Sequence, residues 1–171
     1  MKCLAASLLI VALALVSPLA LGVDCQNNIP ASNPDSIYQG HADGTVTDTR
    51  TGLMWKRCSE GQSWTGTTCA GSASAHTWSQ ALALAEASTF AGRGDWRLAD
   101  IKELTSLVEE CRSAPTINNT VFPNDSSSDV WSGSPFANGS SFAWSVHFVH
   151  GHVNGFIRSD ALRARLVRGG Q

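Results

Sequence analysis

The sequence has few charged residues, and neither sign dominates. Of its 171 residues, 12 are Lys or Arg and 14 are Asp or Glu, so the formal net charge is −2. Proteins that bind nucleic acids through bulk charge are strongly basic. We therefore expect no nucleic-acid partner.

The chain also lacks an apolar run long enough for a confident membrane-spanning helix, which needs about 20 residues. The run from Leu4 to Val16 follows the positive Lys2 and precedes the small residues around Gly22. This pattern predicts a signal peptide over residues 1–22, cleaved near Gly22, with an uncleaved anchor as the less favoured alternative. The mature protein is then expected to be secreted or periplasmic, with no membrane span.

Cysteine is sparse, and its spacing does not suit a metal site. Outside the predicted signal peptide the cysteines are Cys25, Cys58, Cys69 and Cys111. They form neither a CxxC pair nor a Cys/His quartet, so we expect no bound metal. An even number in an exported chain predicts two disulfides, with three possible pairings. Cys58 and Cys69 flank a Gly- and Thr-rich loop that needs its ends tied, so we pair them and, by elimination, pair Cys25 with Cys111.

Motifs for covalent catalysis are missing as well. The sequence has no Gly-x-Ser-x-Gly elbow, no cysteine after Cys111, and no acid that can be assigned to orient a histidine. Glu109 and Glu110 close a predicted helix and are interpreted as surface residues rather than paired catalytic carboxylates. We expect a protein that is not an enzyme and has no cofactor.

The organisation along the chain is that of one α+β domain. Residues 23–44 are rich in Asn, Ser and Pro and are interpreted as an extended arm, while residues 45–171 form the domain. Capping-box residues predict one helix from about Trp78 to Ser88 and a second that follows Asp100 and ends near Cys111. Alternating patterns predict short strands before and after these helices, at 45–48, 53–55, 130–132, 142–149, 153–157 and 164–168. Two helices between an early hairpin and a late meander give the α+β class.

Three ordered motifs point to a known family. They are Thr51-Gly52-Leu53-Met54-Trp55, the run Gly94-Asp95-Trp96-Arg97-Leu98-Ala99-Asp100-Ile101-Lys102-Glu103-Leu104, and Val130-Trp131-Ser132-Gly133-Ser134. With these motifs the chain resembles the bacterial Lcl C-terminal-domain family from about Thr45 to Arg168. The resemblance implies a secreted domain with a C-type-lectin-like fold, in which two helices, a small antiparallel sheet and long loops are tied by disulfides.

The resemblance also sets expectations for individual positions. It places Gly151 in a turn, and Arg165 and Arg168 in the last strand, where many members carry a cysteine at the position of Leu166. Related lectins bind calcium through Glu-Pro-Asn, Gln-Pro-Asp and Trp-Asn-Asp signatures, which are absent here. Asp125 and Asp129 are interpreted as part of a solvated acidic loop, and calcium binding there stays open.

The aromatic residues divide into two groups. Trp55, Trp96 and Trp144 lie in apolar patterns and are predicted to fill the core. Trp64 and Trp131 lie in polar loops, where each either plugs a small core or stacks on a sugar ring, and plugging is favoured.

Polar residues near the C-terminus suggest a ligand surface. His147, His150 and His152 surround one hairpin, either as ordinary exposed turn residues or as a pH-sensitive or anion-binding patch. We hypothesise that the domain recognises a glycan, in one version an anionic or sulfated one, at the cell envelope or on a host surface. The candidate ligand-binding residues are Trp131, Asn138, His147, His150, His152 and Arg158, with Arg163 and Arg165 steering anions.

Two other classes of function stay open. The domain could bind a protein, as an adhesin or an envelope-assembly module. It could also be an oxidoreductase related to formylglycine-generating enzymes, which share the broad fold but use a reactive cysteine pair near the C-terminal end.

Overall fold

A computed structural model describes residues 25–125, 128–137 and 139–169. Within these residues the chain forms a small α+β domain with two α-helices, antiparallel sheets and two disulfides. No helix in this described part of the chain is long and apolar enough to cross a membrane. The predicted signal peptide lies outside the described residues.

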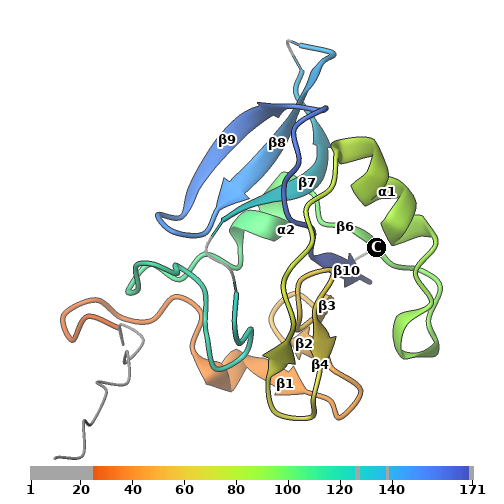
Figure 1. The fold of residues 1–171 in the computed structure, drawn as a ribbon. Coiled ribbons are helices and arrows are strands. Elements are labelled where there is room, and N and C mark those ends of the chain that lie inside the picture. Colours follow the sequence, from red (N-terminus) through yellow and green to blue (C-terminus); the bar gives the residue numbers. More distant parts are fainter. Residues whose placement is uncertain (1–24, 126–127, 138, 170–171) are drawn as a thin grey trace, which may run out of the picture.

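The first sheet joins the two ends of the domain. Its strand order is β1-β2-β3-β10-β6, and all its neighbours pair antiparallel. The strands are β1 (Tyr38–Gly40), β2 (Thr45–Asp48), β3 (Met54–Lys56), β6 (Arg97–Leu98) and β10 (Leu166–Arg168). Strand β10 lies between β3 and β6, so the C-terminal strand closes the sheet that the N-terminal strands begin (Figure 1). A separate two-stranded ribbon pairs β4 (Ser63–Trp64) with β5 (Cys69–Ala70).

A second sheet holds the three long strands near the C-terminus. It has the order β7-β8-β9, formed by β7 (Asp129–Pro135), β8 (Phe142–His147) and β9 (His152–Ile157). Side chains alternate between its faces, so the partners Val130 and Val146 share one face, and Trp131 and Ser145 share the other. The two helices cover different faces. Leu104 of α2 joins the core cluster of Val130 and Val146, whereas Trp78 of α1 packs against the cluster that contains Trp131.

Both helices begin where the sequence predicts. In α1 (Trp78–Glu86) Thr77 and Gln80 form a capping box, and in α2 (Ile101–Thr105) Asp100 and Glu103 do the same. In each box the side chains satisfy amide groups that the first turn leaves without a helical partner. Short 3-10 turns lie at Asp35–Ile37 and Phe90–Gly92.

The predicted end of the second helix is wrong, because α2 stops at Thr105 rather than near Cys111. The Thr105 hydroxyl donates to the Ile101 carbonyl and the Ser106 hydroxyl to the Glu103 carbonyl, both at 2.6 Å. Such hydroxyls compete with the next backbone amides for the helix carbonyls. Val108 then forms an isolated bridge with Ile117, which takes the chain out of the helix.

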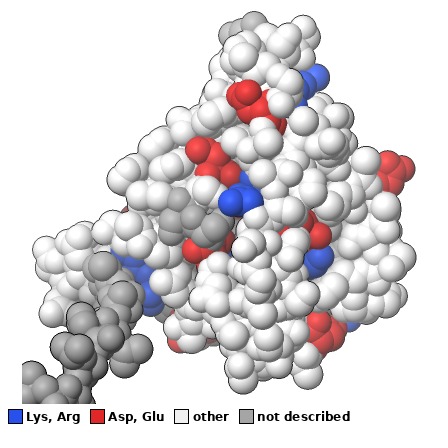
Figure 2. Space-filling view, viewed as in Figure 1, with Lys and Arg blue, Asp and Glu red and all other residues white. Residues whose placement is uncertain are grey.

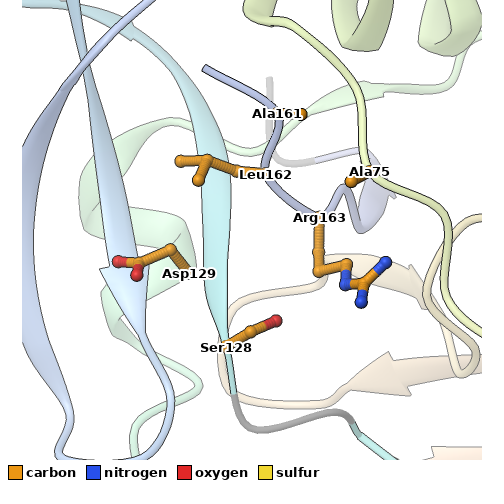
Figure 3. Close-up of a pocket in the computed structure, with 6 residues that line it drawn as sticks. All are labelled: Ala75, Ser128, Asp129, Ala161, Leu162 and Arg163. Carbon is orange, nitrogen blue, oxygen red and sulfur yellow. The ribbon is translucent and has the colours of Figure 1, made fainter.

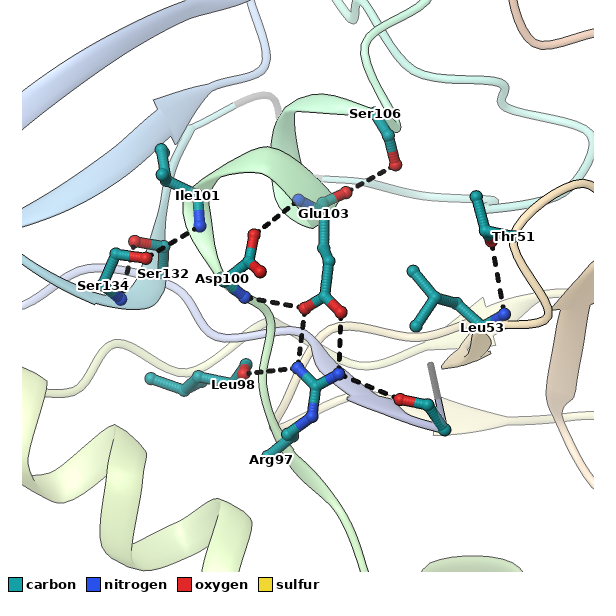
Figure 4. A network of polar contacts seen from close by, with 11 residues as sticks. Thr51, Leu53, Arg97, Leu98, Asp100, Ile101, Glu103, Ser106, Ser132 and Ser134 are labelled. Atoms are coloured by element: carbon teal, nitrogen blue, oxygen red, sulfur yellow. Dashed lines mark hydrogen bonds and ion pairs between the residues drawn. The ribbon is translucent and has the colours of Figure 1, made fainter. Parts of the chain in front are cut away.

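The motif around α2 is held by a polar network (Figure 4). Both terminal nitrogens of the Arg97 guanidinium donate to the Glu103 carboxylate, at 2.6 and 2.7 Å, and one of them also donates to the Gly169 carbonyl. The Ser134 hydroxyl accepts from the Ile101 amide at 3.0 Å, so α2 is fixed to β7 as well as to β6. The hydrogen bonds from Arg97 hold the pKa of Glu103 below its ordinary value.

Both predicted disulfides, Cys58–Cys69 and Cys25–Cys111, are confirmed. The predicted core positions of Trp55 and Trp96 are confirmed too, since these residues are 0% and 3% exposed. The prediction for Trp144 is wrong. Trp144 is half-buried.

Candidate functional site

Aromatic side chains line a groove on the β7-β8-β9 sheet. The groove has a volume of about 340 Å³ and is lined by Phe136, Gly139, Phe142 and Gly155. The Phe136 ring lies 4.3 Å from the Trp144 ring and 6.2 Å from that of Phe142, measured between centroids. We call Phe136, Gly139, Phe142, Trp144 and Gly155 the aromatic groove.

The Phe136 ring can lie on the sheet because a glycine is opposite Trp144. Gly155 pairs with Trp144 across β8 and β9, so both positions belong to the same face of the sheet. A Cβ at Gly155 would lie 3.0 Å from Cε2 of Phe136. The missing side chain therefore lets Phe136 lie across the sheet and against Trp144.

Apolar surface continues along the same face beyond the groove. Phe142 is 38% exposed, its partner Ile157 is 46% exposed, and Val153 on β9 is 39% exposed. Exposed apolar side chains that are neighbours on one face mark a surface for contact with a ligand or partner. This surface was not predicted from the sequence, because the alternation of Phe142, Trp144 and Val146 indicates a buried face, whereas only Val146 is buried.

On the opposite face, at the end of the same hairpin, the three predicted histidines do come together. The ring centroids of His147 and His152 are 5.0 Å apart, those of His147 and His150 are 5.5 Å apart, and those of His150 and His152 are 5.9 Å apart. His147 is half-buried, while His150 and His152 are exposed. We call these three residues together with Asp129 the histidine cluster.

Asp129 is held beside the cluster by neighbours on two strands. It pairs with His147 in the strand register, and its Oδ2 lies 3.9 Å from the Nε2 of His147. Its other oxygen, Oδ1, accepts hydrogen bonds from the Ser145 hydroxyl at 3.3 Å and the Asn154 amide at 3.4 Å. The orientation of the carboxylate is thus set by β8 and β9, and Oδ2 is turned toward the imidazole.

A polar hollow of about 210 Å³ adjoins Asp129. Its lining residues are Ala75, Ser128, Asp129, Ala161, Leu162 and Arg163. Figure 3 shows that the Asp129 side chain and the Arg163 guanidinium point in opposite directions. One terminal nitrogen of Arg163 donates to the Ala73 carbonyl. The hollow therefore offers no converging pair of charges to a small ion.

Several predicted ligand-binding residues are internal instead. Trp131 is fully buried, and its indole N–H donates to the His76 carbonyl at 2.8 Å, so it plugs the core and cannot stack on a sugar. The Arg165 side chain is also fully buried and donates to the carbonyls of Lys56 and Arg57 and to the Asp125 carboxylate. The prediction that Arg165 steers anions is therefore wrong, as is the prediction that Asp125 lies in a solvated loop. The motif of this last strand is structural because the buried guanidinium satisfies backbone groups of β3 and its following turn.

The remaining predicted positions differ in their surroundings. The guanidinium carbon of Arg158 lies 4.3 Å from the centre of the Trp78 ring, and the guanidinium donates to the Phe142 carbonyl at 3.1 Å. Arg158 therefore links the α1 residue Trp78 to strand β8.

The guanidinium carbon of Arg57 lies 4.1 Å from the centre of the Trp64 ring and covers one face of this ring. Asn138 lies outside the described residues. On the face shown in Figure 2, Lys and Arg do not gather into a continuous basic patch.

Glu109, predicted to be a surface residue, is 1% exposed. Its carboxylate accepts from the amides of Ser32 and Asn33, both at 2.8 Å, and thereby ties the N-terminal segment to the domain beside the Cys25–Cys111 bond. Burial acts to raise the pKa of Glu109, but these hydrogen bonds outweigh it and hold the pKa below its ordinary value. The role of Glu109 is structural.

One protein-family model, described as the Lcl C-terminal domain, matches residues 44–168. No curated protein matches the chain. The matched range begins just before β2 and ends with β10, so it includes both the aromatic groove and the histidine cluster. It also agrees with the range over which the three motifs resemble this family.

Proposed function

The chain belongs to the Lcl C-terminal domain family, and on that basis we propose that it is a secreted, non-enzymatic binding module that recognises glycans through the aromatic groove. The proposal rests on one observation. The partly exposed rings of Phe136, Phe142 and Trp144 lie together beside Gly155, which has no side chain. A volume of about 340 Å³ is in the range of small-ligand sites.

The chemistry of a sugar ring suits such a surface. The C–H groups on one face of a pyranose carry partial positive charge, and the face of an aromatic ring is negative. A sugar lying on Phe142 would bury these C–H groups and keep its hydroxyls at the rim.

The charge distribution favours a neutral sugar over a sulfated one. Anionic glycans are usually bound by arginine and lysine side chains that can reach the ligand. Arg165 is buried against Asp125, and Arg163 donates to a backbone carbonyl. Neither guanidinium is therefore free to bind a sulfate group.

We also propose a C-type-lectin-like fold and a location outside the cytoplasm. The sheet that joins the N-terminal strands to the last strand, the helices in the middle of the chain and the β7-β8-β9 sheet support the fold assignment. Two disulfides are consistent with an extracellular or periplasmic protein.

A protein partner at the envelope is the second candidate, favoured by the exposed Val153 and Ile157, which extend the apolar surface beyond the size of one sugar. A formylglycine-type oxidoreductase has less support. That chemistry needs an accessible thiol, whereas Cys58, Cys69 and Cys111 are buried and all four described cysteines are in disulfides.

The test is a glycan array probed with the purified protein, followed by titration of the best ligand into variants. Phe142→Ala should weaken binding about tenfold, because it removes one of the rings on which the sugar stacks. Val153→Ala is the matched control, since Val153 is equally exposed on the same face but does not line the groove. Retention on heparin would reveal an anionic ligand.

The proposal fails if no glycan is retained above the level of a disulfide-rich control protein, or if Phe142→Ala binds as well as the unaltered chain. The second candidate would be established instead if crosslinking in the native envelope recovered one protein partner with the unaltered chain but not with Ile157→Ala.

A further inference from the structure

We infer that the histidine cluster is a binding site for one first-row transition-metal dication, with Zn²⁺, Ni²⁺ and Cu²⁺ as candidates. His147, His150 and His152 would supply imidazole nitrogens, and Asp129 would supply a carboxylate oxygen. This inference rests on the geometry at the closed end of the β8-β9 hairpin and is independent of the proposed glycan site.

The ring planes are stacked, at angles of 28°, 20° and 10° to one another, but the separations of the ring centroids are close to those around a shared ion. Imidazole nitrogens bind Zn²⁺ at roughly 2.0–2.1 Å, so the ring centroids lie about 3.2 Å from the metal and about 5.2 Å from one another at a tetrahedral angle. The three observed centroid separations are 5.0, 5.5 and 5.9 Å. The backbone holds the rings in this arrangement, because His147 and His152 are partners across β8 and β9 and His150 lies in the turn between them.

The position of Asp129 supplies a second, separate observation. Its Oδ2 is 3.9 Å from the Nε2 of His147, too far for a hydrogen bond. Two ligand atoms that share a tetrahedral Zn²⁺ lie about 3.4 Å apart. Ser145 and Asn154 hold the other oxygen, as the outer partners of a metal-binding carboxylate do.

The rings must turn before their nitrogens converge. Among the described residues, Cys25, Glu109 and Cys111 form the one group of three potential ligands whose ligand atoms already lie within 4.8 Å of one another, and its two sulfurs are bonded to each other. His150 and His152 are exposed, so their rings rotate at little cost. The Nδ1 of His147 is buried without a hydrogen-bond partner among the described residues, so the present orientation of that ring is not fixed by a hydrogen bond there.

The chemistry of the donors selects the metal. Three imidazoles and one carboxylate suit Zn²⁺, Cu²⁺ and Ni²⁺, whereas Ca²⁺ and Mg²⁺ require mainly oxygen ligands. The hairpin holds its ligands close in sequence, and Gly151, at φ +74°, makes the turn that brings His152 back opposite His147. A metal there would cross-link the ends of β8 and β9.

Isothermal titration of ZnCl₂ into the purified, untagged chain at pH 7.5 tests the inference, with NiCl₂ and CaCl₂ in parallel. We expect one Zn²⁺ per chain and no comparable signal with CaCl₂. His150→Ala and His152→Ala should each weaken binding by at least about tenfold while the circular dichroism spectrum stays unchanged, because both side chains are exposed. His41→Gln is the control, since His41 lies outside the hairpin and bonds to Thr47.

A shift to pH 5.5 should also weaken Zn²⁺ binding, because protons compete for imidazole nitrogens. The inference is overturned if millimolar Zn²⁺ gives no binding, or if His150→Ala and His152→Ala bind like the unaltered chain. It is equally overturned if His41→Gln abolishes the signal or if CaCl₂ binds as well as ZnCl₂.

Discussion

The Nη2 of Arg165 lies 2.5 Å from the Oδ2 of Asp125, and the two side chains are 0% and 1% exposed. Asp125 belongs to the long loop before β7, whereas Arg165 directly precedes β10. The same guanidinium donates to the carbonyls of Lys56 and Arg57. One buried cation therefore joins the loop, the N-terminal hairpin and the last strand.

Replacing Arg165 by Met should destabilise the domain by about 3–5 kcal/mol, because the Asp125 carboxylate is left buried without its partner. Urea unfolding followed by tryptophan fluorescence measures the change. Arg168→Met is the control in the same strand and should have little effect, since its partner Asp95 is largely exposed. If both substitutions lower the free energy of unfolding equally, burial of the Arg165–Asp125 pair does not determine its contribution to stability.

Glycine at position 151 should be needed for the stability of the fold, for two reasons. Its φ of +74° is in the left-handed region, and a Cβ there would lie 2.7 Å from Cγ1 of Val108. We expect Gly151→Ala to cost about 2–4 kcal/mol of unfolding free energy, through backbone strain together with overpacking. Gly52→Ala, at φ +72° with no atom within 4 Å, has the strain alone and should cost about 1–2 kcal/mol. Equal losses in the two variants would exclude the contact with Val108.

Glu109 should make stability depend on pH in the acid range. Its pKa in the folded protein lies below its ordinary value, so its stabilising contribution is complete above the unfolded pKa of about 4.3 and disappears as the pH falls through the folded pKa. Glu109→Gln should be about 2 kcal/mol less stable at pH 7, and this difference should shrink toward pH 3. Urea unfolding at pH 7, 5, 4 and 3 gives the profile. The exposed neighbour provides the control, because Glu110→Gln should match the unaltered chain throughout.

The two disulfides should contribute unequally. Cys25 and Cys111 are 86 residues apart in sequence, whereas Cys58 and Cys69 are 11 apart. On a chain-entropy model the longer loop contributes about 4.6 kcal/mol and the shorter about 2.8 kcal/mol. Paired Cys→Ala variants, unfolded in urea under non-reducing conditions, measure both. A larger loss from the Cys58–Cys69 variant would show that packing around the bonds outweighs loop entropy.

Local signals in the sequence are sufficient to predict where both helices begin and which cysteines pair. Thr77 with Gln80 and Asp100 with Glu103 act within one turn, so their effect does not depend on the rest of the fold. The pairing of Cys58 with Cys69 follows from a short loop in the same way. The end of α2 was not predictable by that means, because it depends on Val108 finding Ile117 across an intervening loop.

The candidate site was only partly predictable, for a related reason. The sequence brings His147, His150 and His152 together because they surround one turn, and the structure agrees. Burial depends on what covers each face. Trp131 and Arg165 are fully buried, whereas Trp144, on the same face of β8 as the buried Val146, is half-buried. Alternation identifies a face of a strand but not what covers each position on it.

Strand β8 carries Trp144 on one side of the sheet and His147 on the other. An insertion of one residue between them would exchange inward and outward positions for the rest of the strand. An insertion in the segment from 148 to 151 would keep both registers but would displace the fully buried Phe148 or move Gly151 away from Val108. We therefore expect the turn of this hairpin to be as sensitive to insertions as its strands.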